Sequence, residues 1–194
     1  MAYVLGFWFA DGYMRKDKDI LAEIRQALAS GHPIQFMPIN NCYFISFCSK
    51  KLYHDLLRLG GLRKKSKIIE FPAVPKFFLP DFIRGYFDGD GSVFFVNYMR
   101  TKDGRPTTEL RTNFTSGSRK FLEDLMNILH DEIGLPLKKL GVYNNGGSLK
   151  LGYGMKDSDT LLRYMYYDKF PIGLERKAVF VSKIPNYQRH FVYN

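Results

Sequence analysis

Two short segments of the sequence follow the same pattern, and each ends in an acidic residue followed by glycine. They are residues 4–12 (VLGFWFADG) and residues 83–91 (IRGYFDGDG). Each segment is an apolar run of helical length with two small residues four positions apart: Gly6 and Ala10, then Gly85 and Gly89. Residues four apart share one face of an α-helix, and small residues there let a second backbone approach closely. The repeat therefore predicts two helices that pack on each other.

The acids Asp11 and Asp90 fall at the C-terminal ends of these helices. Gly12 and Gly91 stand where a helix commonly ends in a left-handed residue. A carboxylate at the negative end of the helix dipole costs about 0.3–1 kcal/mol, and a second acid beside it adds repulsion. A bound cation removes both penalties, and the unpaired carbonyl oxygens of the last turn are further hard ligands. The pair of acids therefore predicts a magnesium site.

Other interpretations of the acidic segments are weaker. A single copy is equally typical of a helix that ends in an Asp-Gly turn, but two copies favour a shared site. A calcium-binding EF-hand loop starting at Asp88 is excluded, because Val93 stands at its glycine position and Met99 at its closing glutamate position. Neither apolar run is long enough to span a bilayer.

The two segments resemble the paired motifs of the LAGLIDADG homing endonucleases. The stretch from Lys65 to Ser92, which contains KSKIIEFPAVP and FIRGYFDGDGS, resembles the prokaryotic members of that family closely. The resemblance implies an α+β fold in which two pseudo-symmetric αββαββα halves carry saddle-shaped antiparallel sheets. It also implies that the paired motif helices form the interface and that the sheets straddle duplex DNA. We place the halves at residues 1–78 and 79–194.

The same resemblance implies the chemistry. The last acid of each motif binds divalent metal and cuts one DNA strand, and these acids correspond to Asp11 and Asp90, with the carbonyls of Ala10 and Gly89 as further ligands. The expected cofactor is Mg²⁺ or Mn²⁺, whereas Ca²⁺ is expected to bind without supporting cleavage. A metal-bound water would attack each scissile phosphate. The family resemblance implies cuts across the minor groove that leave 3′ overhangs, as in intron homing.

Composition points to the same kind of partner. The chain has 29 Lys and Arg against 19 Asp and Glu, a formal charge of +10, which predicts a polyanionic partner. A basic surface kept for solubility is the simpler alternative. We expect a monomer that binds double-stranded DNA at a long, mostly asymmetric site, with intron RNA as a second candidate partner and no membrane. Cys42 and Cys48 have no metal-ligand spacing, and no leader or membrane span is apparent. An intracellular location follows, in the cytoplasm and nucleoid or in an organelle.

A two-stranded ribbon is predicted after the second motif. Residues 92–100 and 107–116 flank an Asp-Gly turn, and their alternation gives one polar and aromatic face. Such a ribbon fits the major groove, where Arg pairs with guanine and Asn with adenine, although a solvent-exposed sheet face alternates in the same way. The predicted base-reading residues are Arg100, Arg111 and Asn113. The other predicted DNA contacts are Tyr13, Arg15, Lys16, Ser92, Tyr98, Thr115, Ser148 and Lys150.

Further elements follow the ribbon in sequence. Ser118 is a predicted N-cap of a helix that stops at Gly134, and a second hairpin is predicted over residues 137–153. Aligning the double leucines of the last helix in each half places Lys51 opposite Lys156. In the family a basic residue there often lies beside the metal centre, where it can stabilise charge developing at phosphorus. Each lysine is equally compatible with a surface contact to phosphate.

The two halves differ in length. Asp11 and Asp90 are 79 residues apart, whereas Lys51 and Lys156 are 105 apart, so the first half is 26 residues shorter between these positions. After Lys16 the sequence passes directly into what resembles the helix after a second strand. Either this half has lost a DNA-reading strand, or a mobile hairpin is absent from the chain. Phe9 also replaces the first acid of the motif, which Asp88 retains.

Three functions are thus compatible with the sequence. A site-specific DNA endonuclease is favoured, because both motif acids are present. An RNA maturase that assists intron splicing shares the same scaffold. A DNA-binding protein that does not cut, or that nicks one strand, is favoured by the short first half.

Overall fold

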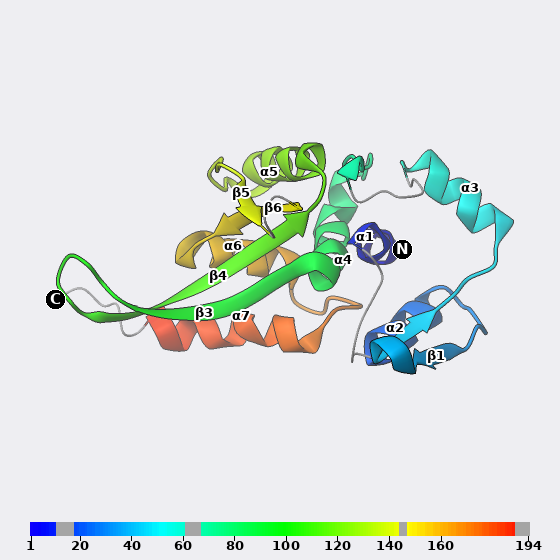
Figure 1. Ribbon diagram of the computed structural model, residues 1–194, viewed down its shortest axis with the longest axis horizontal. Coiled ribbons are helices and arrows are strands. Elements are labelled where there is room, and N and C mark those ends of the chain that lie inside the picture. Colours follow the sequence, from blue (N-terminus) through cyan, green and yellow to red (C-terminus); the bar gives the residue numbers. More distant parts are fainter. Residues whose placement is uncertain (11–17, 61–66, 144–146, 189–194) are drawn as a thin grey trace.

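The two repeated segments form helices that cross at the centre of the molecule, α1 (Ala2–Ala10) and α4 (Leu79–Asp90) (Figure 1). The computed structural model describes residues 1–10, 18–60, 67–143 and 147–188. Among these residues, two antiparallel sheets lie on opposite sides of the helix pair, so the chain is an α+β protein organised around its repeat.

Glycine explains why the two helices come so close. A Cβ atom on Gly6 would lie 1.9 Å from the carbonyl oxygen of Phe82, and a Cβ atom on Gly85 would lie 2.1 Å from that of Tyr3. These contacts are reciprocal, because Tyr3 and Phe82 occupy the same position in the repeat. The predicted packing of the motif helices is therefore confirmed, with backbone against backbone and a pseudo-two-fold relation between the two.

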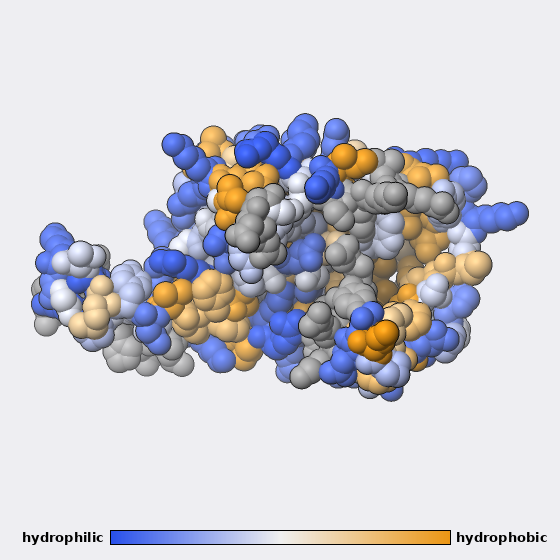
Figure 2. Space-filling view, viewed as in Figure 1, coloured by the Kyte–Doolittle hydropathy of each residue, from blue (hydrophilic) through white to orange (hydrophobic). Residues whose placement is uncertain are grey.

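The second half has the full αββαββα order. Its four-stranded antiparallel sheet has the strand order β3-β4-β6-β5, and α5 and α6 follow its two hairpins. After α4 the elements are β3 (Gly91–Met99), β4 (Pro106–Ser116), α5 (Arg119–Ile133), β5 (Gly141–Tyr143), β6 (Ser148–Tyr153) and α6 (Met155–Met165), followed by α7 (Glu175–Gln188). In Figure 2 the tip of the β3–β4 ribbon projects from the body of the molecule and carries mainly hydrophilic residues.

The turn and the helix ends that the sequence predicts in this half are present. Gly104 takes a left-handed conformation (φ +65°) in the turn between β3 and β4. The Ser118 hydroxyl accepts a hydrogen bond from the backbone N–H of Phe121 at the start of α5, and Gly134 ends that helix with φ +68°. One expectation is wrong: Gly91 is extended (φ −93°) rather than left-handed. A Cβ atom there would lie 2.2 Å from the Phe87 ring, so close packing rather than φ explains this glycine.

The first half is shorter, as the sequence predicts. Its described sheet has two strands, β1 and β2, which follow α2 and precede α3. The bounds are α2 (Lys18–Ala27), β1 (Ile34–Met37), a 3-10 turn (Pro38–Asn40), β2 (Cys42–Ile45) and α3 (Lys50–Arg58), and a second 3-10 turn (Lys76–Phe78) leads into α4. Seven residues separate α1 from α2, whereas 28 separate α4 from α5.

Two hydrophobic cores lie on either side of α1. The larger one packs α4, α5, α6 and the inner face of the four-stranded sheet, and it receives Phe9 and Ala10 from α1. The smaller one packs α2 and the two-stranded sheet, and it receives Tyr3 and Phe7. Apolar residues around the whole circumference of α1 are explained by this position, since both sides of the helix are buried. In the described part of the chain, no helix is long and apolar enough to cross a membrane.

Candidate metal centre and nucleic-acid interface

Asp90 is the last residue of α4, and it lines a pocket of about 230 Å³. The pocket lies where α4 ends, where β4 ends and where β6 begins. The lining residues with polar side chains are Asp90, Lys67, Tyr86, Thr115, Ser116 and Ser148. The pocket therefore brings one of the two predicted metal ligands together with a cation and with hydroxyl groups from the sheet.

The end of α1 forms another wall of this pocket through Phe9 and Ala10. A Cβ atom on Gly89 would lie 2.3 Å from that of Ala10, so the residues that precede Asp11 and Asp90 in the chain are in contact. Asp11 itself lies outside the described residues, as do the predicted DNA contacts Tyr13, Arg15 and Lys16. Within the described residues, no group of three or more His, Cys, Asp or Glu could hold a metal ion.

A buried lysine holds the turn that carries Asp90. Lys177 of α7 is 4% exposed, and its ammonium group donates to the carbonyl oxygens of Phe87, Asp88 (3.1 Å) and Gly91 (2.8 Å). Its Nζ also lies 4.7 Å from the centre of the Phe87 ring. A cation there neutralises the negative end of α4 and satisfies carbonyls that the helix leaves unpaired. Lys177 thereby fixes the backbone on both sides of Asp90.

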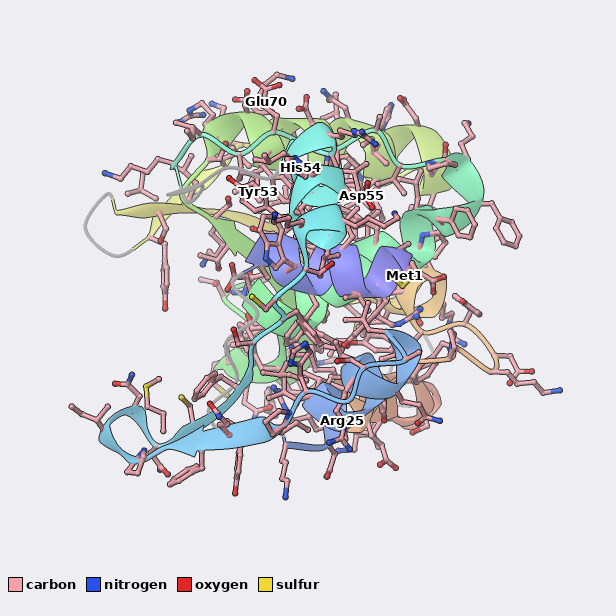
Figure 3. The ribbon with its side chains drawn as sticks, turned by 90° about the vertical axis from the view of Figure 1, so that its right-hand side faces the viewer. Met1, Arg25, Tyr53, His54, Asp55 and Glu70 are labelled. Atoms are coloured by element: carbon pink, nitrogen blue, oxygen red, sulfur yellow. The ribbon has the colours of Figure 1, made fainter. Side chains whose placement is uncertain are left out.

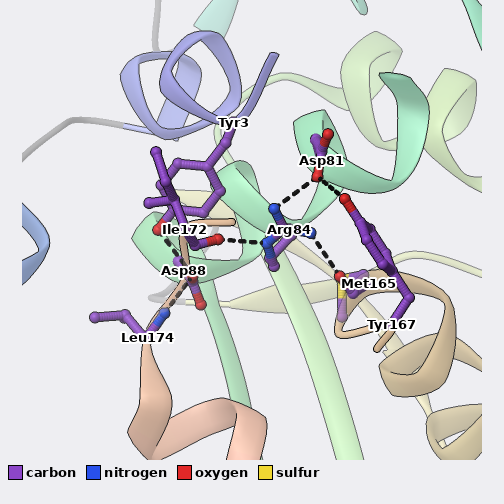
Figure 4. A network of polar contacts seen from close by, with 8 residues as sticks. All are labelled: Tyr3, Asp81, Arg84, Asp88, Met165, Tyr167, Ile172 and Leu174. Atoms are coloured by element: carbon purple, nitrogen blue, oxygen red, sulfur yellow. Dashed lines mark hydrogen bonds and ion pairs between the residues drawn. The ribbon is translucent and has the colours of Figure 1, made fainter. Parts of the chain in front are cut away.

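Asp88 and Arg84 of α4 place the segment that leads to Lys177 (Figure 4). The buried Asp88 carboxylate accepts hydrogen bonds from the backbone N–H of Leu174 (2.9 Å), from the hydroxyl of Tyr3 (2.8 Å) and from the hydroxyl of Tyr166. Leu174 directly precedes α7, so this contact sets where that helix begins. Desolvation by burial, followed by the nearby Asp88 charge, raises the pKa of both tyrosines. Both phenols therefore stay protonated and remain donors.

Arg84 binds the same segment at two further points. It is fully buried, and it donates to the carbonyl oxygens of Met165 (2.8 Å) and Ile172 (2.7 Å) and to the carboxylate of Asp81 (2.6 Å). Positions 81, 84 and 88 lie on one face of α4. Residues on one face of α4 therefore bind the segment that connects α6 to α7.

We expect Lys177→Met to lower the free energy of unfolding by about 2–4 kcal/mol, because a buried charged donor to three carbonyls is lost. Urea unfolding followed by circular dichroism measures the change. Lys183→Met on the exposed part of the same helix is the matched control and should change stability by less than about 0.5 kcal/mol. Equal effects of the two variants would show that the Lys177 contacts do not stabilise the end of α4.

The open face of the four-stranded sheet leads into the pocket. Ser92 pairs with Asn113, Phe94 with Arg111, Tyr98 with Thr107, and Thr115 with Lys150. Directly paired residues share a face, so the predicted alternation along the ribbon is confirmed. The opposite face, with Leu110, Phe114 and Leu151, is buried in the larger core. Thr115 and Ser148 belong to the open face and also line the pocket with Asp90.

Several side chains of this face are held in place. The guanidinium group of Arg111 donates to the Glu109 carboxylate (2.9 Å), and the Asn113 amide donates to the Ser92 hydroxyl (3.4 Å). Arg100, at the tip, lies 3.6 Å from Asp103. A pre-ordered donor loses less conformational entropy when it binds a ligand than a free one does.

Part of this chain is similar to a known protein family. Residues 78–148 match the model of the LAGLIDADG-like domain. The second half of the chain is therefore similar to the LAGLIDADG-like domain. The match covers the second motif helix and most of the four-stranded sheet, which are the elements that form the pocket and the open face.

Solved LAGLIDADG structures share the fold of the whole chain. Meganuclease I-SmaMI bound to uncleavable DNA is 14% identical, with a TM-score of 0.59 over 98% of this chain and 92% of that one. Meganuclease I-CpaMI bound to uncleaved DNA is 15% identical, with a TM-score of 0.57 over 97% and 89%.

One curated relative of this chain is a much longer protein. It is named "Probable translation initiation factor IF-2" and comes from Thermococcus kodakarensis. It is 28% identical over an alignment of 177 positions, which covers 84% of this chain and 14% of that protein. The chain therefore corresponds to one segment of that relative.

The two lysines that the LAGLIDADG resemblance made candidates do not line the pocket of Asp90. Lys51 is exposed on α3, where its Nζ lies 2.6 Å from the carboxylate of Asp55. Asp55 is labelled on this helix in Figure 3. The hydrogen bond from Lys51 lowers the pKa of Asp55. α3 borders a different, apolar pocket of about 520 Å³ between it and α1. Lys156 is exposed near the start of α6, beyond the end of β6 that lies farther from the pocket. Neither lysine lines the pocket of Asp90.

Lys67 is the cation that the sequence reasoning missed. It is exposed and lines the Asp90 pocket from the segment that connects the halves. It belongs to the stretch KSKIIEFPAVP, so the signal was in the residues that carry the family resemblance. The alignment of double leucines compares only the last helix of each half. Lys67 belongs to neither helix, so that alignment could not identify it.

Proposed function

We propose that this protein is a divalent-metal-dependent endonuclease that cuts double-stranded DNA at specific sites. The observation that carries the proposal is the pocket in which Asp90 and the end of α1 meet the edge of the open sheet face. In this proposal the DNA duplex lies along the face of the sheet that carries Arg111 and Asn113. One of its phosphate groups then reaches the pocket. The related I-SmaMI and I-CpaMI structures contain bound DNA, which supports the same partner here.

The donors available in the pocket suit a hard cation. Asp90 supplies a carboxylate oxygen at a helix end, and the Gly89 and Ala10 carbonyls with the Asp11 carboxylate would complete an oxygen-only set that Mg²⁺ or Mn²⁺ prefers. A bound metal ion supplies an activated water and stabilises charge on the leaving 3′ oxygen. Ca²⁺ would bind the same oxygens without supporting cleavage. Lys177 positions the backbone at Asp90, and Lys67 stabilises the charge that develops on the phosphate.

The proposal is tested by incubating the purified protein with a plasmid library that carries randomised inserts, in Mg²⁺ or in EDTA. Linear plasmid that forms only with Mg²⁺ supports cleavage of both strands, and sequencing its ends tests the proposed 3′ overhangs. Open circles alone would favour a nicking enzyme, the candidate that the shortened first half supports. Binding without either product would overturn the proposed nuclease activity and favour the RNA maturase or a non-cutting DNA-binding protein.

We expect Lys67→Met to slow cleavage by about 10- to 100-fold at saturating DNA, because it removes a cation from the pocket where charge develops. Lys51→Met and Lys156→Met are the matched comparison and should change the rate by less than about threefold. Single-turnover cleavage of an isolated target measures all three. A large loss for Lys51 or Lys156 with none for Lys67 would support the predicted catalytic role of these two lysines and contradict the role proposed for Lys67.

A further inference from the structure

The two halves carry sheets of different size, with two and four strands, on opposite sides of the helix pair (Figure 1). In the second half, the open face carries side chains that can donate to or accept from base edges. Among them are Ser92, Arg111, Asn113 and Lys150, which the strand register places on one side of the sheet. Base pairs are distinguished in the major groove by such hydrogen bonds. This face can therefore read sequence.

The β1–β2 sheet of the first half, which corresponds in element order to β5–β6, has one polar residue on its outer face. Ile34, Tyr43 and Ile45 pack into the smaller core and so define the inner face of the β1–β2 sheet. The outer face then carries the two remaining cross-strand pairs, Gln35 with Phe44 and Met37 with Cys42. Its single polar side chain with full hydrogen-bonding capacity is Gln35, and Cys42 is completely buried. This face has one group that could read a base edge.

Chain length prevents the first half from supplying a second ribbon of the same size. The β3–β4 ribbon uses strands of 9 and 11 residues. Only seven residues connect α1 to α2. Because an extended residue advances by about 3.3 Å, seven residues cannot form two strands of that length. The asymmetry is therefore a property of the sequence as well as of the described structure.

We propose that base recognition is one-sided: the sequence information of the DNA target lies on the side of the scissile position that the β3–β4 ribbon covers. The first half then contributes its helix end to the metal site, and its described strands β1 and β2 contribute little to sequence choice. This inference rests on the proposed function and deepens it, because it states which part of the duplex substrate determines specificity. It differs from a target read along its whole length by two equivalent sheets.

A binding selection in EDTA tests this without requiring cleavage. A duplex library with 30 randomised base pairs is bound, recovered and sequenced, and nuclease protection defines the length of the covered DNA. We expect the preferred bases to cluster at one end of the protected region. Preferences of similar strength at both ends, or no preference at any position, would overturn the inference. Failure of Mg²⁺-dependent cleavage, measured separately, would count against the proposed function alone.

Two amide variants assign the preferred end to the ribbon. Asn113→Ala is expected to reduce discrimination about 5- to 100-fold at one or two positions inside the preferred cluster. Gln35→Ala, the matched amide on the outer face of the first half, is expected to change every position by less than about twofold. A loss of preference in Gln35→Ala as large as that in Asn113→Ala would contradict one-sided recognition. Circular dichroism of both variants confirms that each retains its fold.

Discussion

Asp90→Asn is expected to reduce DNA cleavage by at least about 1,000-fold while the protein still binds its target. The substitution keeps the size of the side chain but removes the negative charge that would hold a divalent cation at the end of α4. A loss of about 1,000-fold corresponds to roughly 4 kcal/mol of transition-state stabilisation. Single-turnover cleavage with Mg²⁺ and a binding titration in EDTA, both on the selected target, measure the two properties separately.

Asp103→Asn is the matched control for this prediction. Asp103 lies in the turn of the β3–β4 ribbon and pairs with Arg100 and Arg105 at 3.6 Å, well away from the end of α4. At saturating DNA, where a weaker Arg100 contact affects binding and not the chemical step, its loss should alter the cleavage rate by less than about threefold. If Asp90→Asn cuts at the wild-type rate, the metal site is elsewhere. If it loses binding and cleavage together, Asp90 has a structural role and the proposed catalytic role fails.

Gly85→Ala is expected to destabilise the protein by more than about 4 kcal/mol or to prevent folding. The new Cβ atom would lie 2.1 Å from the backbone carbonyl oxygen of Tyr3, and a backbone atom cannot move aside as a flexible side chain can. The two motif helices would have to separate, and both hydrophobic cores share α1. Urea unfolding of the purified variant, or its yield in soluble form, measures the effect.

Gly31→Ala provides the contrast. A Cβ atom on Gly31 would meet nothing within 4 Å, so this variant should remain within about 0.5 kcal/mol of the wild type. Gly6→Ala should behave like Gly85→Ala, since the corresponding Cβ atom would lie 1.9 Å from the Phe82 carbonyl oxygen. Wild-type stability of both helix variants would mean that the helices do not pack through these glycines.

The central helix pair could be predicted from the sequence because it depends on local spacing. Small residues four apart and a repeated pattern are sufficient to predict close packing, and Gly6 and Gly85 make those contacts. The Asp-Gly turn of the ribbon and the Ser118 N-cap are also local signals, which do not depend on the rest of the fold. The shortness of the first half follows from counting residues between landmarks.

The surroundings of Asp90 could not be predicted in the same way. Lys177 follows Asp90 by 87 positions and reaches the end of α4 only because Asp88 and Arg84 bind the segment between α6 and α7. A charged residue in an amphipathic helix gives no sign that its ammonium group is buried. Lys67 lines the pocket from a connecting segment without periodicity. Such positions depend on tertiary contacts, which neither propensity nor spacing encodes.

The hydrogen bond from Tyr3 to Asp88 has a consequence for how the two halves recognise each other. Phe82 stands in the second motif where Tyr3 stands in the first, and Phe9 stands where Asp88 does. If α4 packed on a second α4, Asp88 would face a phenylalanine, and a buried carboxylate would lose one of its donors. If α1 packed on a second α1, the tyrosine would lose its acceptor. Each motif helix is therefore a better partner for the other than for its own copy, which disfavours pairing between like helices of two chains.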